Sequence, residues 1–328
     1  MTTDALELFA VTGDGLVRLR EEGGAWRADL LRADERAQCL ALDPRDPAVL
    51  YLGTVGGGVA KSADGGRTWA DLGLPEADVF SLAVGPADGA VYAGTEPSRL
   101  FRSDDGGQTW REPAALRELP SAPTWSFPPR PWTSHVRWIA PHPSEAGLLL
   151  VGIELGGVLR SEDGGITWQD QRPGAEKDAH ALAWHPRDPE RAYEAGGGGA
   201  AFSRDGGQSW VAADEGRDRH YTWGLAVAPD APDTWFVSAT HGPRQAHGGG
   251  DAQARLYRRR GDAPWEALGG GLADPLDSFP YALLAAAGRI FAGLGDGRLF
   301  ASRDGGDTWA PAEVRGAALR GLKALASR

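Results

Sequence analysis

The chain has 328 residues, a formal net charge of −11 and a sequence pI of about 5.1, and 41% of its residues are hydrophobic. That hydrophobic share suits a sizeable core, and the acidic balance disfavours nucleic-acid binding, which needs a basic face. Because Cys39 is the only cysteine, a disulfide scaffold and a multi-cysteine metal site are both excluded.

Membrane and export signals are missing from the sequence pattern. No apolar run reaches the roughly 18 residues of a transmembrane helix. The first residues, MTTDALE, have neither the basic nor the apolar region of a signal peptide. We therefore expect a cytoplasmic protein with no membrane partner. Only Lys61, Lys177 and Lys323 among the 34 basic residues are lysines, a bias typical of GC-rich bacterial genomes.

An octapeptide of the form Ser-x-Asp-Gly-Gly-x-Thr/Ser-Trp recurs along the chain. It occurs five times, at residues 62–69, 103–110, 161–168, 203–210 and 302–309. Degenerate copies end at Trp26 and Trp265. The Asp-Gly-Gly core predicts a hairpin turn, since glycine adopts positive φ at little cost and Asp and Ser/Thr side chains bond the turn backbone.

Alternating apolar segments precede each octapeptide. In the second unit they are residues 38–44, 49–53 and 58–61, and equivalent segments begin at residues 80, 137, 180, 223 and 281. The repeat interval is roughly 42 residues, with two longer intervals that mark insertions. Four short strands per unit predict an all-β protein, a seven-bladed β-propeller of four-stranded antiparallel blades that forms a single domain over residues 1–328.

The two ends of the chain are predicted to complete blade one together. Residues 6–11 already look like a second strand, so the first strand of that blade is missing. Residues 319–325 follow the last octapeptide and look like a first strand. We expect this C-terminal strand to close the ring in blade one, which leaves no open sheet edge.

The five octapeptides resemble the Asp-box, or BNR, repeat. The chain is similar to Asp-box propellers such as the sialidase superfamily, the sortilin ectodomain and photosystem II assembly factors. The resemblance implies a propeller in which the boxes are peripheral hairpins without a part in chemistry. Sialidase activity is not expected, because the Arg-Ile-Pro segment of that family is absent and the predicted blade number is seven rather than six.

Ligand sites of this fold are expected near the axis, on the face opposite the boxes. Both insertions fall on that face. The first, residues 111–135, is proline-rich and carries Trp125 and Trp132; the second, residues 239–253, carries His241 and Arg244.

One residue per blade is expected at the start of each inner strand. This ring consists of Gln38, Phe80, Arg137, His180, Trp223, Tyr281 and Arg320. Cations, a histidine and aromatic rings are typical of a pocket for a polar ligand, although a channel simply filled by bulky side chains is the alternative. The expected ligand-binding residues are Arg137, Trp223, Arg320, Trp125, Trp132, Tyr221 and Arg244. Trp138 is expected to pack between blades, and Cys39 to be buried and inert.

A divalent transition metal is a further possibility on this face. Histidine and carboxylate side chains are its usual ligands, and the expected set is His135, His180, His241 and Glu154. None of these residues has the i, i+4 spacing of a helical metal motif. Asp178 and Glu96 are other carboxylates expected nearby.

Two functions from different classes remain open. The first is a binding module for a small anionic or sugar-like ligand, or for a protein segment. The second is an enzyme, either a carbohydrate-active hydrolase or lyase or a metal-dependent enzyme, with Glu154, His180 and Tyr281 as catalytic residues. A monomer is expected, since a closed propeller needs no partner to protect its sheet edges.

Overall fold

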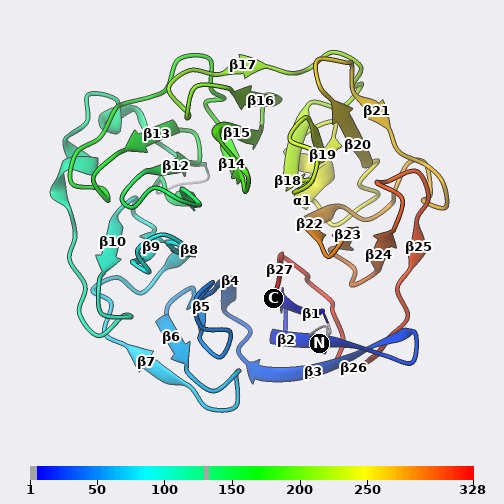
Figure 1. Ribbon diagram of the computed structural model, residues 1–328, viewed down its shortest axis with the longest axis horizontal. Helices are drawn as coiled ribbons and strands as arrows, with labels where there is room; N and C mark the ends of the chain where they lie inside the picture. Colours follow the sequence, from blue (N-terminus) through cyan, green and yellow to red (C-terminus); the bar gives the residue numbers. More distant parts are fainter. Residues whose placement is uncertain (1–5, 129–132) are drawn as a thin grey trace.

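The computed structural model describes residues 6–128 and 133–328. Seven sheets stand around a central axis; in blades two to seven the first strand lies nearest the centre, and in blade one the C-terminal strand β27 (Ala324–Ser327) does (Figure 1). The prediction of a seven-bladed all-β propeller is confirmed. No helix in the described residues is long and apolar enough to cross a bilayer.

The strands follow chain order around the ring. Blade one holds β1 (Glu7–Thr12), β2 (Gly15–Glu22), β3 (Ala25–Ala33), β26 (Val314–Gly316) and β27 (Ala324–Ser327). Blade two holds β4 (Ala37–Leu42), β5 (Leu50–Thr54), β6 (Gly58–Ser62) and β7 (Ala70–Leu72). Blade three holds β8 (Val79–Val84), β9 (Val91–Thr95) and β10 (Leu100–Ser103), and blade four holds β11 (Val136–Pro141), β12 (Leu149–Ile153) and β13 (Gly157–Ser161).

The remaining blades have four strands each. Blade five holds β14 (Ala179–His185), β15 (Asp188–Gly196), β16 (Ala200–Ser203) and β17 (Val211–Ala212). Blade six holds β18 (Tyr221–Val227), β19 (Thr234–Thr240), β20 (Arg255–Arg260) and β21 (Glu266–Ala267). Blade seven holds β22 (Pro280–Ala286), β23 (Arg289–Leu294), β24 (Leu299–Ser302) and β25 (Ala310–Pro311).

Blades three and four depart from the predicted four strands. Their outermost strand is reduced to one bridge each, Arg102–Arg111 and Arg160–Gln169. In blade three the chain leaves this bridge for the first insertion, which contains the 3₁₀ helices η1 (Ala114–Glu118) and η2 (Ala122–Thr124). The second insertion contains the short helix α1 (Pro243–His247) between β19 and β20.

The predicted ring closure is confirmed, with a shift in its position. Strand β27 pairs antiparallel with β1, from Leu8–Ser327 to Val11–Ala324, and β26 runs parallel to β3 (Figure 1). The closing strand begins at residue 324 rather than 319. The chain turns at Gly321, where φ is +67°, a value that a β-strand does not adopt. Leu322 then packs into the core, and the strand begins only after this turn.

Each Asp-box is a closed network of hydrogen bonds, as the box at residues 103–110 illustrates. The Ser103 hydroxyl donates to Asp105 Oδ1 (2.7 Å) and accepts from the amide of Gly107 (2.7 Å). The Thr109 hydroxyl donates to the other oxygen of Asp105 (2.6 Å). The hydrogen bonds from Thr109 and Ser103 lower the pKa of Asp105 to about 2. All these contacts are internal to the hairpin, so the box serves the fold.

The hydrophobic core lies between neighbouring blades. Between blades two and three, for example, Tyr51 and Val59 pack with Leu82 and Phe101. Each blade therefore depends on both neighbours for burial, and the inner strands are held firmly around the axis.

Candidate functional site

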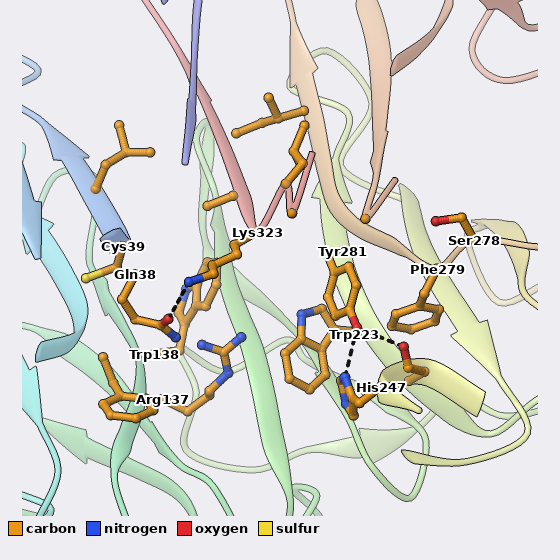
Figure 2. A pocket seen from close by; sticks show the side chains of 18 of the residues that line it. Gln38, Cys39, Arg137, Trp138, Trp223, His247, Ser278, Phe279, Tyr281 and Lys323 are labelled. Carbon is orange, nitrogen blue, oxygen red and sulfur yellow. Dashed lines mark hydrogen bonds between the residues drawn. The ribbon is translucent and has the colours of Figure 1, made fainter. Parts of the chain in front are cut away.

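A cavity of about 840 Å³ opens where inner strands from different blades face one another. Its walls come from β4, β8, β11, β18 and β22, from α1 and from the segment that leads into β27 (Figure 2). This volume lies within the range of small-molecule sites.

β-Bulges direct the ring residues. Register shifts occur in five inner strands around Gln38, Phe80, Arg137, His180 and Tyr281. A sixth shift, between Thr222 and Leu225, includes Trp223. A bulge leaves its extra residue unpaired and re-aims the side chain. The ring residues predicted from the sequence therefore occupy equivalent positions because a bulge recurs at the same place in these six inner strands.

Arg320, the predicted seventh ring residue, does not line the cavity and is exposed. Lys323 takes that place, because the turn at Gly321 carries the chain past Arg320 before it reaches the axis. The Lys323 ammonium donates to the Ala37 carbonyl (2.7 Å) and to Gln38 Oε1 (3.2 Å), and Figure 2 draws the second of these contacts. Burial lowers the pKa of Lys323, and the charge of Arg137 lowers it further.

Arg137 is the second cation of the cavity. Its Cζ lies 4.5 Å from the centre of the Trp223 ring, a cation–π contact. Its Nε lies 3.6 Å from Glu154 Oε2 and has no hydrogen-bond partner among the described residues. The guanidinium is thus fixed in place, and its donors are not used up by the protein.

His247 of α1 joins the aromatic wall. Tyr281 donates its hydroxyl proton to the Ala246 carbonyl (2.8 Å), so its oxygen accepts from His247 Nδ1 (3.0 Å; Figure 2). In the neutral ring His247 Nε2 then accepts from the Tyr221 hydroxyl (2.9 Å). Burial lowers the pKa of His247, which favours this neutral form. The second insertion is thereby fastened to blades six and seven.

A buried histidine–carboxylate pair lies behind the cavity wall. His135 Nε2 is 2.6 Å from Glu154 Oε2, and its Nδ1 is 3.1 Å from Glu96 Oε2. Burial alone would lower the pKa of His135, but the hydrogen bonds to Glu154 and Glu96 outweigh it and raise the pKa. Burial alone would raise the pKa of Glu154, but the hydrogen bond of His135 and the charge of Arg137 lower it. The pair thus favours its charged forms.

One group of side chains in the described residues brings candidate metal-ligand atoms together. Ligand atoms of Glu154, Asp178 and His180 all lie within 4.8 Å of one another. The set predicted from sequence is changed: both ring nitrogens of His135 are engaged by carboxylates, and His241 is exposed and outside the group. Asp178, two residues before His180, completes the group instead.

Other predicted site residues lie elsewhere. Trp125, in the first insertion, is buried in the core and does not line the cavity. Its indole N–H donates to Ser121 Oγ (3.0 Å). Arg244 is exposed on α1, and Trp132 lies outside the described residues.

Sequence reasoning also missed two parts of the cavity wall. Trp138, expected to pack between blades, lines the cavity and is 37% exposed. Cys39 also lines it, and burial raises the pKa of its thiol to about 12, so it is a poor nucleophile.

Comparison with known proteins supports the fold. The family model "BNR/Asp-box repeat" matches residues 101–112. No curated protein matches the chain. The GH74 xyloglucanase from Xanthomonas campestris is 21% identical with a TM-score of 0.70, and the match covers 97% of this chain and 52% of that one. The GH74 enzyme from Niastella koreensis is 17% identical with a TM-score of 0.70, covering 94% and 52%.

The photosystem II assembly-factor propeller expected from the resemblance is also represented. A structure of YCF48 bound to D1 peptide is 19% identical with a TM-score of 0.58, and the match covers 95% of this chain and 85% of that one. The chain spans about half the length of these two GH74 enzymes. At these identities the likeness establishes a shared propeller fold.

Proposed function

We propose that this chain, a seven-bladed Asp-box propeller, binds a small anionic molecule in the central cavity. The observation that carries the proposal is the pair of cations, Arg137 and Lys323, that line one cavity. Burial lowers the pKa of Lys323 and the charge of Arg137 lowers it further, so a bound anion would stabilise both cations.

The remaining walls suit a ligand with a ring or an apolar part. Four aromatic residues line the same cavity: Phe80, Trp138, Trp223 and Tyr281. Aromatic faces pack against sugar rings and planar groups. A sugar acid, a sugar phosphate or a compact carboxylic acid fits this combination of charge and aromatic surface.

Glycoside hydrolysis, the activity in the names of the GH74 neighbours, is less well supported. It needs a carboxylic acid whose pKa is raised, facing the substrate. The described cavity lining contains two acidic residues, Asp277 and Asp296, and both pair with Arg298. The hydrogen bond from Arg298 lowers the pKa of Asp277. Glu154, behind the wall, has a lowered pKa as well. A catalytic role of Glu154, His180 and Tyr281 remains a second proposal.

The test is isothermal titration with D-glucuronate, glucose 6-phosphate and citrate, with D-glucose as the neutral match of the first two. We expect at least one anion to bind and glucose not to bind. Arg137→Gln and Lys323→Gln should each weaken binding by about 10- to 100-fold, the worth of one charged hydrogen bond.

Arg320→Gln is the matched control, because Arg320 is exposed outside the cavity. It should bind like the parent protein. If Arg320→Gln weakens binding as much as Arg137→Gln, or if no anion binds better than glucose, the proposal is wrong.

A further inference from the structure

We infer that Glu154, Asp178 and His180 form a site for one divalent transition-metal ion, separate from the proposed anion site. The three residues come from two neighbouring blades. Glu154 follows β12 in blade four, Asp178 precedes β14 of blade five, and His180 is the second residue of that strand. Two blades must therefore pack correctly before the ligand atoms converge within 4.8 Å.

His180 carries the inference. Its side chain is fully buried (0% exposed), and its Nδ1 is 2.6 Å from the Thr222 carbonyl oxygen. A carbonyl only accepts, so Nδ1 bears the proton and the neutral ring has its lone pair on Nε2. Nε2 is buried, has no hydrogen-bond partner in the described part of the chain, and lies 3.4 Å from Asp178 Oδ2. A lone pair facing a carboxylate oxygen is repulsive unless a cation lies between them.

Hydrogen bonds from neighbouring residues orient the three proposed ligands, as they do around the ligands of known metal sites. A metal-bound histidine usually donates its other ring N–H to a carbonyl or carboxylate, as His180 does to Thr222. His135 holds Glu154 through a 2.6 Å contact, and Glu96 holds His135 in turn. The amide of Leu155 donates to Asp178 Oδ1 (3.3 Å), which leaves Oδ2 directed at His180.

The donor set indicates the class of metal. One imidazole nitrogen and two carboxylate oxygens suit Mn²⁺, Fe²⁺, Co²⁺ or Zn²⁺ better than Ca²⁺ or Mg²⁺, which prefer oxygen alone. Three protein ligands leave coordination positions for water or another ligand. The His180 ring lies 4.4 Å from the Trp223 ring, so the ion would sit directly behind the wall of the cavity.

The experiment is metal titration of chelator-treated, untagged protein. Mn²⁺, Co²⁺ and Zn²⁺ are added in a calorimeter, and the visible absorption of Co²⁺ reports nitrogen and oxygen ligation. We expect one equivalent to bind. Asp178→Asn and Glu154→Gln should each lower the affinity at least 10-fold, because an amide replaces a charged ligand without a change of shape.

Asp251→Asn is the matched control, since Asp251 is exposed and lies outside the group. It should bind metal like the parent. Melting curves establish whether each variant is folded. If Asp178→Asn does not fold, the affinity of Glu154→Gln provides the test. If none of these ions binds at near-unit stoichiometry, the inference is overturned. Unchanged affinity in both ligand variants would overturn it too. Neither result affects the anion titration, which is done with metal-free protein after the chelator has been removed.

Discussion

Removal of residues 316–328 is expected to lower the melting temperature by about 10 °C or more, or to prevent folding. The deletion takes away β27, which supplies four residue pairs to β1. It also removes Leu319 and Leu322, which are 4% and 1% exposed in the core between blades one and seven. Each buried leucine is worth about 2 kcal/mol and each ladder hydrogen bond about 1 kcal/mol. The ring would then be open, with β1 as an unpaired edge.

Thermal unfolding and size-exclusion chromatography measure this effect. Self-association of the truncated chain is expected through the free edge of β1. Leu322→Ala should reproduce part of the loss, about 2 to 5 kcal/mol, whereas Arg320→Ala, at an exposed position two residues earlier, should be neutral. A truncated protein as stable as the full chain would show that the closing strand contributes little.

The fold could be predicted because its signals are local. The Ser, Asp and Thr side chains of each box bond their own turn, and glycines 106 and 107 adopt φ of 71° and 92° there, so eight consecutive residues specify the hairpin. Five of the seven expected ring residues could be predicted for the same reason: Gln38, Phe80, Arg137, Trp223 and Tyr281 line the cavity, whereas His180 and Arg320 do not. Blades two to seven carry a bulge near the start of their inner strand, so equivalent positions in sequence remain equivalent in space.

The rest of the site depends on places where the repeat is broken. Lys323 reaches the cavity only because the chain turns at Gly321, and nothing in the blade pattern specifies that turn. His247 joins the wall because an insertion forms α1 and folds back onto Tyr281. Trp125 packs into the core instead of lining the cavity, and the composition of a loop does not reveal which of its side chains pack inward. Such contacts are tertiary and have no periodic signature.

Replacement of Glu194 by glutamine is expected to stabilise the protein at neutral pH and to have little effect near pH 4.5. Glu194 lies in β15 and is 0% exposed, and burial raises its pKa well above the usual value of 4.5. The hydrogen bond from the Glu176 amide opposes this shift but does not cancel it. One oxygen accepts from the Glu176 amide (3.0 Å), and the other has no hydrogen-bond partner among the described residues. A carboxyl in such a place is favoured in its protonated form.

The direction with pH follows from proton binding. Above pH 4.5 the unfolded chain releases the proton of Glu194, while the folded chain retains it until its own raised pKa is reached. The folded state therefore binds more protons, and its stability falls as the pH rises through this window. Each tenfold difference in proton affinity costs about 1.4 kcal/mol, or about 2 °C of melting temperature for a chain of this length. Glutamine keeps the acceptor oxygen and does not titrate, so it escapes the loss.

Melting temperatures of the parent and of Glu194→Gln, recorded from pH 4.5 to pH 8, test this prediction. The two curves should lie close together at the acidic end and separate progressively, with the variant higher. Glu35→Gln, at an exposed glutamate, is the matched control and should follow the parent throughout. Parallel curves for Glu194→Gln and the parent would mean that the folded protein accommodates the ionised carboxylate in the wall of blade five. The buried acid would then act as an ordinary hydrogen-bond acceptor, and burial would not control its protonation.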